Sequence, residues 1–254
     1  PDQDDPDQDD RDHDDADGDA ADGDAADQDG TPLDQLGVLA MQTVAIDEEL
    51  EHLEIYTSQG LLSLLWHGAA DLENAVVCVG GAMGGMLGPD GGLFHQLGRV
   101  LPSMGIGLVR VSYRQPNDLP MCVHDTVATM ELLARHGARR FITMGHSFGG
   151  AVAIQAAAHL DRPSVPGIVT FATQSAGCEV AERLGDRNLL LFHGTNDQIL
   201  PAQASEMVRF LAETGELVLL PGADHLLHPA GEEIRTRLES HLPEVFAACA
   251  AEFG

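Results

Sequence analysis

The stretch that decides the fold runs from residue 141 to residue 154 and reads Phe-Ile-Thr-Met-Gly-His-Ser-Phe-Gly-Gly-Ala-Val-Ala-Ile. The mostly apolar residues 141–144 predict a buried strand, and the apolar run after the glycines predicts a helix. Between them stands the pattern G-x-S-x-G, with Ser147 at its centre. Glycines two residues to either side remove side chains where strand and helix nearly collide, as in a sharp turn that presents a reactive serine. The alternative is a glycine-rich turn whose serine merely caps the helix.

A serine hydroxyl is a weak nucleophile, so it needs a base, and the base needs a group that orients it. In sites built on such a turn, the acid and then the histidine follow the serine along the chain. Asp197 comes shortly after the apolar run 189–192, and His225 comes shortly after the run 217–220. Both lie in loops that follow predicted strands, so we predict that Ser147, Asp197 and His225 meet at one edge of the sheet.

Neighbouring histidines and acids leave alternatives open. His228 competes with His225 for the role of base, although a residue before a proline suits the flank of the last helix. Asp224 is expected to turn the loop, His193 to bond nearby backbone, and His146 to pack beside the serine. No His, Asp or Glu group has the spacing of a metal site, because the His-Leu-Leu-His run at 225–228 lacks a third ligand.

Outward from this motif, short apolar runs alternate with helical patterns along the chain. Strands are expected at 53–56, 61–66, 75–79, 107–111, 141–144, 167–171, 189–192 and 217–220. Helices are expected at 93–101, 123–135, 149–159, 202–213 and 234–249, the last with Pro243 as a candidate break. This alternation predicts an α/β protein with a mostly parallel, twisted sheet and helices on both faces. Residues 33–52 are expected to form a helix or an irregular lead-in.

Three separated strings of sequence resemble the α/β-hydrolase superfamily, in its small, lidless branch, similar to dienelactone hydrolases and compact esterases or thioesterases. They are Gly-His-Ser-Phe-Gly-Gly at 145–150, His-Gly-Thr-Asn-Asp-Gln-Ile-Leu-Pro at 193–201, and Gly-Ala-Asp-His at 222–225. The resemblance covers about residues 50–250 and implies the α/β-hydrolase fold. Only about seventeen residues separate the strands that end near 171 and begin near 189, so no inserted cap domain is expected.

The resemblance also implies an oxyanion hole made of two backbone N–H groups. Carried over by position, Phe148 donates one N–H and Ala82 or Met83 donates the other. The family usually has His-Gly where this loop begins, whereas here residues 80–86 read Gly-Gly-Ala-Met-Gly-Gly-Met. Such a loop can still present N–H groups, or it can be flexible with no anion role. The expected substrate-binding residues are Met83, Met86, Leu87, Phe148, Ile199 and, for a carboxylate or carbonyl, Arg114.

The chain has 254 residues, a formal net charge of −28 and no lysine. This acidity argues against partners such as nucleic acids and anionic membranes, and no apolar run is long enough for a transmembrane helix. Residues 1–32 hold fifteen aspartates and are expected to form a disordered acidic tail, with 33–254 as a single domain. An interaction or solubility segment and calcium binding are the other interpretations of this tail. The N-terminal residues show no basic region followed by an apolar run, so no secretory leader is expected. The four scattered cysteines are expected to be free thiols in a reducing cytoplasm.

We therefore expect a serine hydrolase that cleaves a carboxylic ester or thioester through a Ser-Asp-His triad and an acyl-enzyme intermediate. Neither a metal ion nor a cofactor is expected. The alternatives are an amide or C–C bond hydrolase on the same triad, and a non-catalytic protein that binds a small molecule in the same pocket. The expected partner is a small-molecule substrate, and the expected assembly is a monomer or a homodimer.

Overall fold

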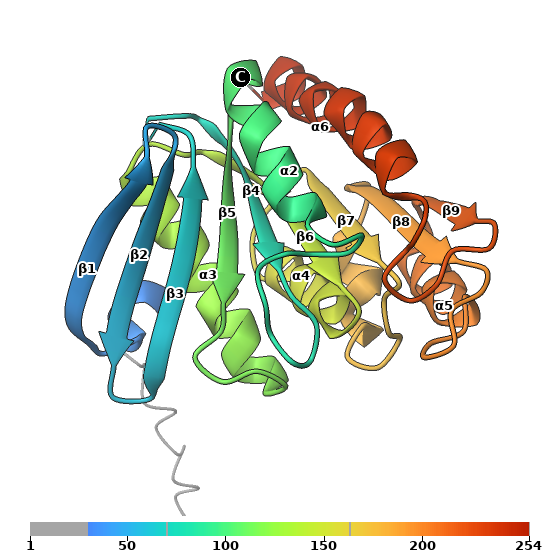
Figure 1. Ribbon diagram of the computed structural model, residues 1–254, viewed down its shortest axis with the longest axis horizontal. Helices are drawn as coiled ribbons and strands as arrows, with labels where there is room; N and C mark the ends of the chain where they lie inside the picture. The colour runs from blue at the N-terminus through green and yellow to red at the C-terminus, as the bar shows by residue number, and fades with distance from the viewer. Residues whose placement is uncertain (1–29, 70, 163, 254) are drawn as a thin grey trace, which may run out of the picture.

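The computed structural model describes residues 30–69, 71–162 and 164–253. Within them, one nine-stranded sheet crosses the molecule in the order β1-β2-β3-β5-β4-β6-β7-β8-β9 (Figure 1). The strands are β1 (Val38–Asp47), β2 (Leu50–Thr57), β3 (Gly60–His67), β4 (Asn74–Val79), β5 (Ile106–Ser112), β6 (Arg140–His146), β7 (Gly167–Phe171), β8 (Asn188–Gly194) and β9 (Glu216–Leu220). All eight strands predicted from the sequence are present, and β1 is an addition.

Six strands of the sheet, from β5 through β4 to β9, run parallel, and β1 to β3 join them by antiparallel pairing. The parallel strands read as continuous apolar runs because both of their faces are buried, as in β4 and β7. The sheet order reverses at β4, which pairs with β5 on one side and β6 on the other. Open α/β sheets bind ligands at the carboxyl ends of the strands at such a switch point.

Helices cover both faces of the sheet, as predicted (Figure 1). One face packs against α1 (Pro32–Gln35), α3 (Leu119–Arg135), α4 (Phe148–Ala158) and α5 (Gln203–Ala212), in an apolar core that includes Leu33, Val127, Ile154 and Val208. The other face packs against α2 (Leu93–Val100) and α6 (Gly231–Phe253), in a second core that includes Phe94, Phe171 and Leu238.

The last helix, α6, continues through Pro243, so the candidate break is not observed. Proline removes one backbone N–H donor from the helix. The residues on both sides of it are nevertheless buried against the sheet, among them Leu238, Leu242, Val245 and Phe246. Burial of this apolar stripe holds the two halves in one helix, because tertiary packing contributes most of a helix's stability in proteins.

The lead-in at residues 33–52 differs from the prediction. It contains the short helix α1, capped by Thr31, and then the ten-residue strand β1, which forms a hairpin with β2. Every residue of β1 is exposed, and register shifts near each end interrupt its alternation. The two-residue apolar period that reveals a half-buried strand is therefore absent from this sequence.

The connection between β7 and β8 is short. Between β7 and β8 it forms only a loop and the short 3-10 helix η2 (Glu179–Leu184), so the absence of an inserted cap is as predicted. The short 3-10 helix η1 (Leu101–Met104) follows α2. Most of the predicted acidic tail, residues 1–29, lies outside the described residues. Among those that are described, no helix combines the length and apolar character needed to cross a bilayer.

Candidate active site

Ser147 lies at the sharp turn between β6 and α4, with φ 57° and ψ −118°. This left-handed conformation is uncommon for a residue with a side chain and marks stored backbone strain. A Cβ atom on Gly145 would lie 1.9 Å from the carbonyl oxygen of Gly149, and one on Gly149 would lie 2.3 Å from that of Gly80. Only glycine fits at these positions. The Ser147 side chain makes no capping hydrogen bond to α4, which removes the alternative of a mere helix cap.

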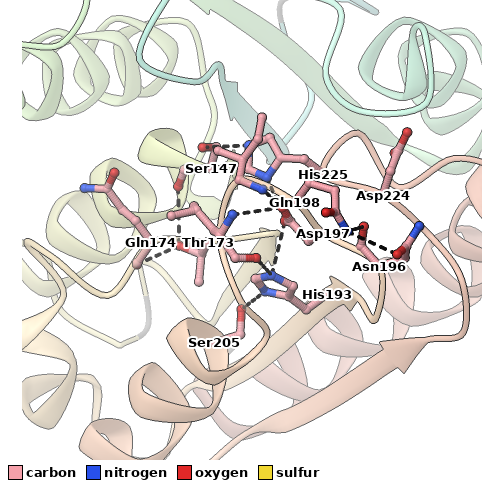
Figure 2. A network of polar contacts seen from close by, with 12 residues as sticks. Ser147, Thr173, Gln174, His193, Asn196, Asp197, Gln198, Ser205, Asp224 and His225 are labelled. Carbon is pink, nitrogen blue, oxygen red and sulfur yellow. Dashed lines mark hydrogen bonds and ion pairs between the residues drawn. The ribbon is translucent and has the colours of Figure 1, made fainter.

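Three side chains from three strand ends form one hydrogen-bonded chain (Figure 2). His225 Nε2 lies 3.1 Å from Ser147 Oγ, and His225 Nδ1 lies 2.7 Å from Asp197 Oδ2. A carboxylate only accepts hydrogen bonds, so the His225 proton sits on Nδ1 and donates to Asp197. In the neutral imidazole, Nε2 then carries no proton and can accept from the serine hydroxyl, the arrangement that general-base catalysis requires.

Asp197 is fixed in place by its own backbone. Its Oδ1 accepts from the N–H groups of Ile199 at 2.8 Å and Leu200 at 2.9 Å, and its side chain is 1 % exposed. Burial on its own raises the pKa of this carboxyl, but the bonds from Leu200, His225 and Ile199 outweigh burial and leave the pKa below its ordinary value. The group is therefore an anion at neutral pH, directed at His225.

The other candidate groups take supporting positions. His193 donates from Nε2 to the Leu200 carbonyl at 3.1 Å, lies 3.3 Å from Asp197, and accepts at Nδ1 from Ser205 at 2.7 Å. His146 lies beside the ring of His225, with centroids 5.0 Å apart, and donates from Nε2 to the His225 carbonyl at 2.9 Å. Burial lowers the pKa of His146 to about 4, so this ring is neutral.

The loop that carries His225 is shaped by Asp224, whose side chain points away from the His225 ring (Figure 2). Asp224 Oδ1 accepts from the N–H groups of Leu226 at 2.9 Å and His228 at 3.0 Å. His228 faces Asp90 and Asp224, at 3.5 and 3.7 Å. The geometry thus assigns the contact with serine to His225 rather than to its competitor His228.

A cavity of about 420 Å³ opens above Ser147. Of the predicted pocket side chains, Met83, Met86, Leu87 and Ile199 line it, and Leu226, which was not predicted, lines it as well. Met83 is 94 % exposed and Ile199 is 69 % exposed, so the mouth is open. No Asp, Glu or Arg lines this cavity among the described residues.

The glycine-rich loop after β4 forms one wall of the cavity. Ala82 and Met83 stand at the tip of a turn closed by a hydrogen bond from Gly84 N–H to the Gly81 carbonyl, 2.8 Å. A Cβ atom on Gly81 would lie 3.7 Å from that of Ser147, so this loop reaches the nucleophile. A hydrogen bond connects this loop to β5, because Arg110 Nη1 donates to the carbonyl of Met86 at 3.3 Å.

Phe148 contributes differently from what was predicted. Its side chain is buried and packs edge-on against Tyr113, with ring centroids 6.5 Å apart, so it does not line the cavity. Its backbone lies at the first position of α4, where N–H groups have no partner inside the helix. This N–H stays a candidate oxyanion donor beside Ser147.

Arg114, predicted to hold a substrate carboxylate or carbonyl, is placed elsewhere. Its Nε donates to Asp125 Oδ1 at 2.5 Å, and both side chains are at most 1 % exposed. The remaining guanidinium nitrogens contact Gln59 and His124. Since a buried charge must be paired, Asp125 on α3 holds Arg114 inside the fold and away from the cavity.

Within the part of the chain that the structure describes, the surroundings of the site hold neither a cluster of metal ligands nor a disulfide. In the residues that the structure describes, no three His, Cys, Asp or Glu side chains gather to hold a metal ion. No disulfide joins the buried cysteines Cys78, Cys122, Cys178 and Cys249. Burial raises the pKa of the thiols of Cys122 and Cys178 to about 12, so neither is a nucleophile at neutral pH.

Comparison with known proteins shows which fold the chain has. No family model and no curated protein matches the sequence. Among solved structures, Est1E from Butyrivibrio proteoclasticus is similar at TM-score 0.64 and 14% identity, covering 77% of this chain and 99% of its own. Dienelactone hydrolase from Anabaena variabilis is similar at TM-score 0.62 and 16% identity, with 82% and 98% covered. A serine hydrolase without lid from Xanthomonas campestris is similar at TM-score 0.59 and 21% identity, with 77% and 94% covered. The chain therefore has the α/β-hydrolase fold, in its form without an inserted cap.

Proposed function

We propose that this protein is a serine hydrolase that cleaves a carboxylic ester or thioester through an acyl-enzyme intermediate. The observation that carries the proposal is the hydrogen-bonded chain from Ser147 through His225 to Asp197, at 3.1 and 2.7 Å, at the floor of an open cavity. A protein that only bound small molecules would have no need of a strained serine whose hydroxyl is aligned with a histidine Nε2.

The reaction follows from the positions of these groups. His225 Nε2 takes the proton of Ser147 as Oγ forms a bond to the substrate's carbonyl carbon. The oxyanion is stabilised by the N–H of Phe148 and that of Ala82 or Met83. The tetrahedral intermediate breaks its bond to the leaving alcohol or thiol, to which His225 returns the proton. A water molecule, deprotonated by His225, then releases the acid and restores Ser147.

The cavity favours an uncharged, apolar acyl group. Its apolar side-chain lining is largely methionine, leucine and isoleucine, and among the described residues no Arg lines it to pair with an anion. The chain's net charge of −28 further repels anionic substrates such as phosphate-bearing thioesters. We therefore place neutral esters ahead of charged thioesters. One similar structure is of Est1E with ferulic acid bound, which adds aromatic esters to the substrates worth testing.

The first test is labelling by a fluorophosphonate, read by intact mass. We expect one adduct on the wild type, none on Ser147→Ala or His225→Ala, and an unchanged adduct on the matched control His228→Ala. Hydrolysis of p-nitrophenyl esters of increasing length, with a ferulate ester and a coenzyme A thioester alongside, then ranks the substrates. A folded wild type that takes no adduct, or Ser147→Ala that is labelled equally, would refute the proposal.

A further inference from the structure

Arg110 is a cation buried within the sheet. It stands on β5 between Val109 and Val111, which are fully buried, and it is itself only 4 % exposed. A guanidinium loses most of its hydration at such a place, and in protein interiors a carboxylate usually compensates for that loss. The groups that accept hydrogen bonds from Arg110 therefore indicate what this buried charge does.

Among the described residues, the acceptors of Arg110 are all uncharged. Its Nε donates to His67 Nε2 at 3.1 Å, its Nη2 to His95 Nδ1 at 3.4 Å, and its Nη1 to the carbonyl of Met86 at 3.3 Å. Burial lowers the pKa of His67 to about 4 and also lowers the pKa of His95, so both rings are neutral at pH 7 and can accept. Two imidazoles hold the guanidinium on β5, and its remaining bond goes to a backbone carbonyl of the glycine-rich loop.

The other two arginines that are buried in the described part of the chain have structural partners. Arg114 is paired with Asp125. Arg187 directly precedes β8, at the amino end of the parallel strands, and donates to the backbone carbonyls of Leu160, Val165, Arg183 and Leu184. Of the three, Arg110 is the one whose hydrogen bonds reach the loop beside Ser147.

This loop has little rigidity of its own. Five of the nine residues 80–88 are glycine, and Gly84, Gly85 and Gly88 have φ angles of 73°, 98° and 75°. Glycine loses more backbone freedom on folding than any other residue, so a loop of this composition is costly to fix in one conformation. Oxyanion donors nevertheless have to be fixed before the reaction begins. Contacts from outside the loop must therefore hold it.

The two ends of the loop are held by neutral donors. Tyr113 Oη donates to the Gly80 carbonyl at 3.2 Å, and the N–H of Phe94 donates to the Leu87 carbonyl at 3.0 Å. Between these points, the bond from Arg110 is the only one that joins residues 81–86 to another part of the described chain. Without Arg110, that segment would keep only the hydrogen bond of its own turn.

We propose that Arg110 is a positioning residue for hydrolysis at Ser147. By holding the Met86 carbonyl, it fixes the segment 81–86 so that the N–H of Ala82 or Met83 is directed at the oxyanion. Within the described residues neither N–H has a hydrogen-bond partner, so both are available to a ligand. Arg110 does not line the cavity and acts through the loop alone. The inference rests on the proposed function.

The test compares Arg110→Met with the wild type on a p-nitrophenyl ester. Activities are expressed per serine titrated by fluorophosphonate, so that unfolded protein does not count. We expect kcat to fall about 10- to 100-fold, as for a misplaced oxyanion donor, with KM within about threefold. The matched control Arg187→Met also removes a buried guanidinium, but one at the opposite end of the strands, and it should keep the native kcat even where its melting temperature falls.

A second readout separates positioning from general loss of structure. In the thiono ester, sulfur replaces the carbonyl oxygen and is a larger and weaker hydrogen-bond acceptor, so a formed oxyanion hole favours the oxygen ester. Arg110→Met should reduce this preference about tenfold, because the rate on the oxygen ester falls more than the rate on the thiono ester. Arg187→Met should keep the native preference. If Arg110→Met does not fold, Arg110→Lys retains the charge and should show a smaller change in the same direction.

The outcomes distinguish this inference from the proposed function. A folded wild type that takes no fluorophosphonate adduct would refute both. A labelled wild type, together with native kcat and native oxygen-to-sulfur preference in Arg110→Met, would overturn the role of Arg110 alone. An unchanged preference in Arg110→Lys, where that is the variant that folds, would overturn it too. An equal fall in preference in Arg187→Met would show that loss of any buried arginine has this effect, and it would also overturn the inference.

Discussion

Asp197→Asn is the substitution with the sharpest expected effect. In the native chain, Oδ1 accepts from the N–H groups of Ile199 and Leu200, and Oδ2 accepts from His225 Nδ1 at 2.7 Å. Asparagine retains one oxygen, and the two backbone donors hold it at the Oδ1 position. Its NH₂ then faces Nδ1, which must lose its proton to accept the bond. The proton moves to Nε2, which can no longer accept from Ser147.

The magnitude follows from this change of tautomer. Loss of the base should lower kcat by about four orders of magnitude, or about 5 kcal/mol of transition-state stabilisation. Because the two backbone bonds to Oδ1 survive, the free energy of unfolding should change by no more than about 2 kcal/mol. Steady-state kinetics on a p-nitrophenyl ester and urea denaturation at neutral pH measure the two quantities.

Asp224→Asn is the matched control, since it makes the same substitution next to His225 in sequence. Asp224 orders the loop through two N–H contacts to Oδ1, and asparagine retains that oxygen. We expect kcat within several-fold of the wild type. An Asp197→Asn enzyme that keeps a tenth or more of the native kcat, or a control that loses as much activity, would refute the assignment of Asp197 as the orienting acid.

Three further predictions follow from burial and geometry. Burial lowers the pKa of His146 to about 4, against 6.5 when unfolded, so the unfolded chain binds more protons and stability falls as the pH drops through this window. On acidification from pH 8 to 5, the wild type should lose about 2 kcal/mol more free energy of unfolding than His146→Gln, as measured by urea denaturation. Equal losses in the two proteins would contradict this prediction. Gly80→Ala puts a Cβ atom 2.3 Å from a backbone oxygen and should cost about 3 kcal/mol of unfolding free energy, whereas Gly81→Ala meets its nearest atom at 3.7 Å and should keep native stability in thermal melts. Arg114→Met leaves Asp125 buried and without its cationic partner, so the free energy of unfolding should fall by about 3–5 kcal/mol while KM is unchanged. A raised KM at native stability would instead indicate that Arg114 binds the substrate.

Most of the parallel sheet could be predicted because its strands are buried on both faces. The runs at 75–79 and 189–192 contain only apolar residues, and burial of both faces is the physical cause of that composition. The edge strand β1 was missed for the opposite reason, since it buries neither face and its two register shifts break the alternation. The candidate break at Pro243 was wrong because the sequence shows the missing N–H but not the packing of the residues on either side of it.

The candidate site, too, could be predicted only in part from the sequence. Ser147, Asp197 and His225 could be located because each follows a strand, and the ends of parallel strands share one edge. Arg114 also follows a strand, but its role is decided by Asp125, which α3 brings beneath it, and no local pattern reveals that contact. Phe148 was placed in the pocket by its position beside the serine, whereas the start of α4 turns its ring toward Tyr113. Tertiary contacts of this kind are the part that sequence patterns do not contain.

The open mouth above Ser147 has a consequence for the fate of a bound acyl group. With Met83 and Ile199 largely exposed and no cap between β7 and β8, an acyl group on the serine stays in contact with the surrounding solution. Enzymes that close a lid choose which nucleophile reaches the intermediate. If the proposed acyl-enzyme forms, no lid makes this choice here, so added alcohols should compete with water as acyl acceptors in proportion to their concentration. The same architecture that would make a hydrolase in dilute buffer would make a transacylase in an alcohol-rich one.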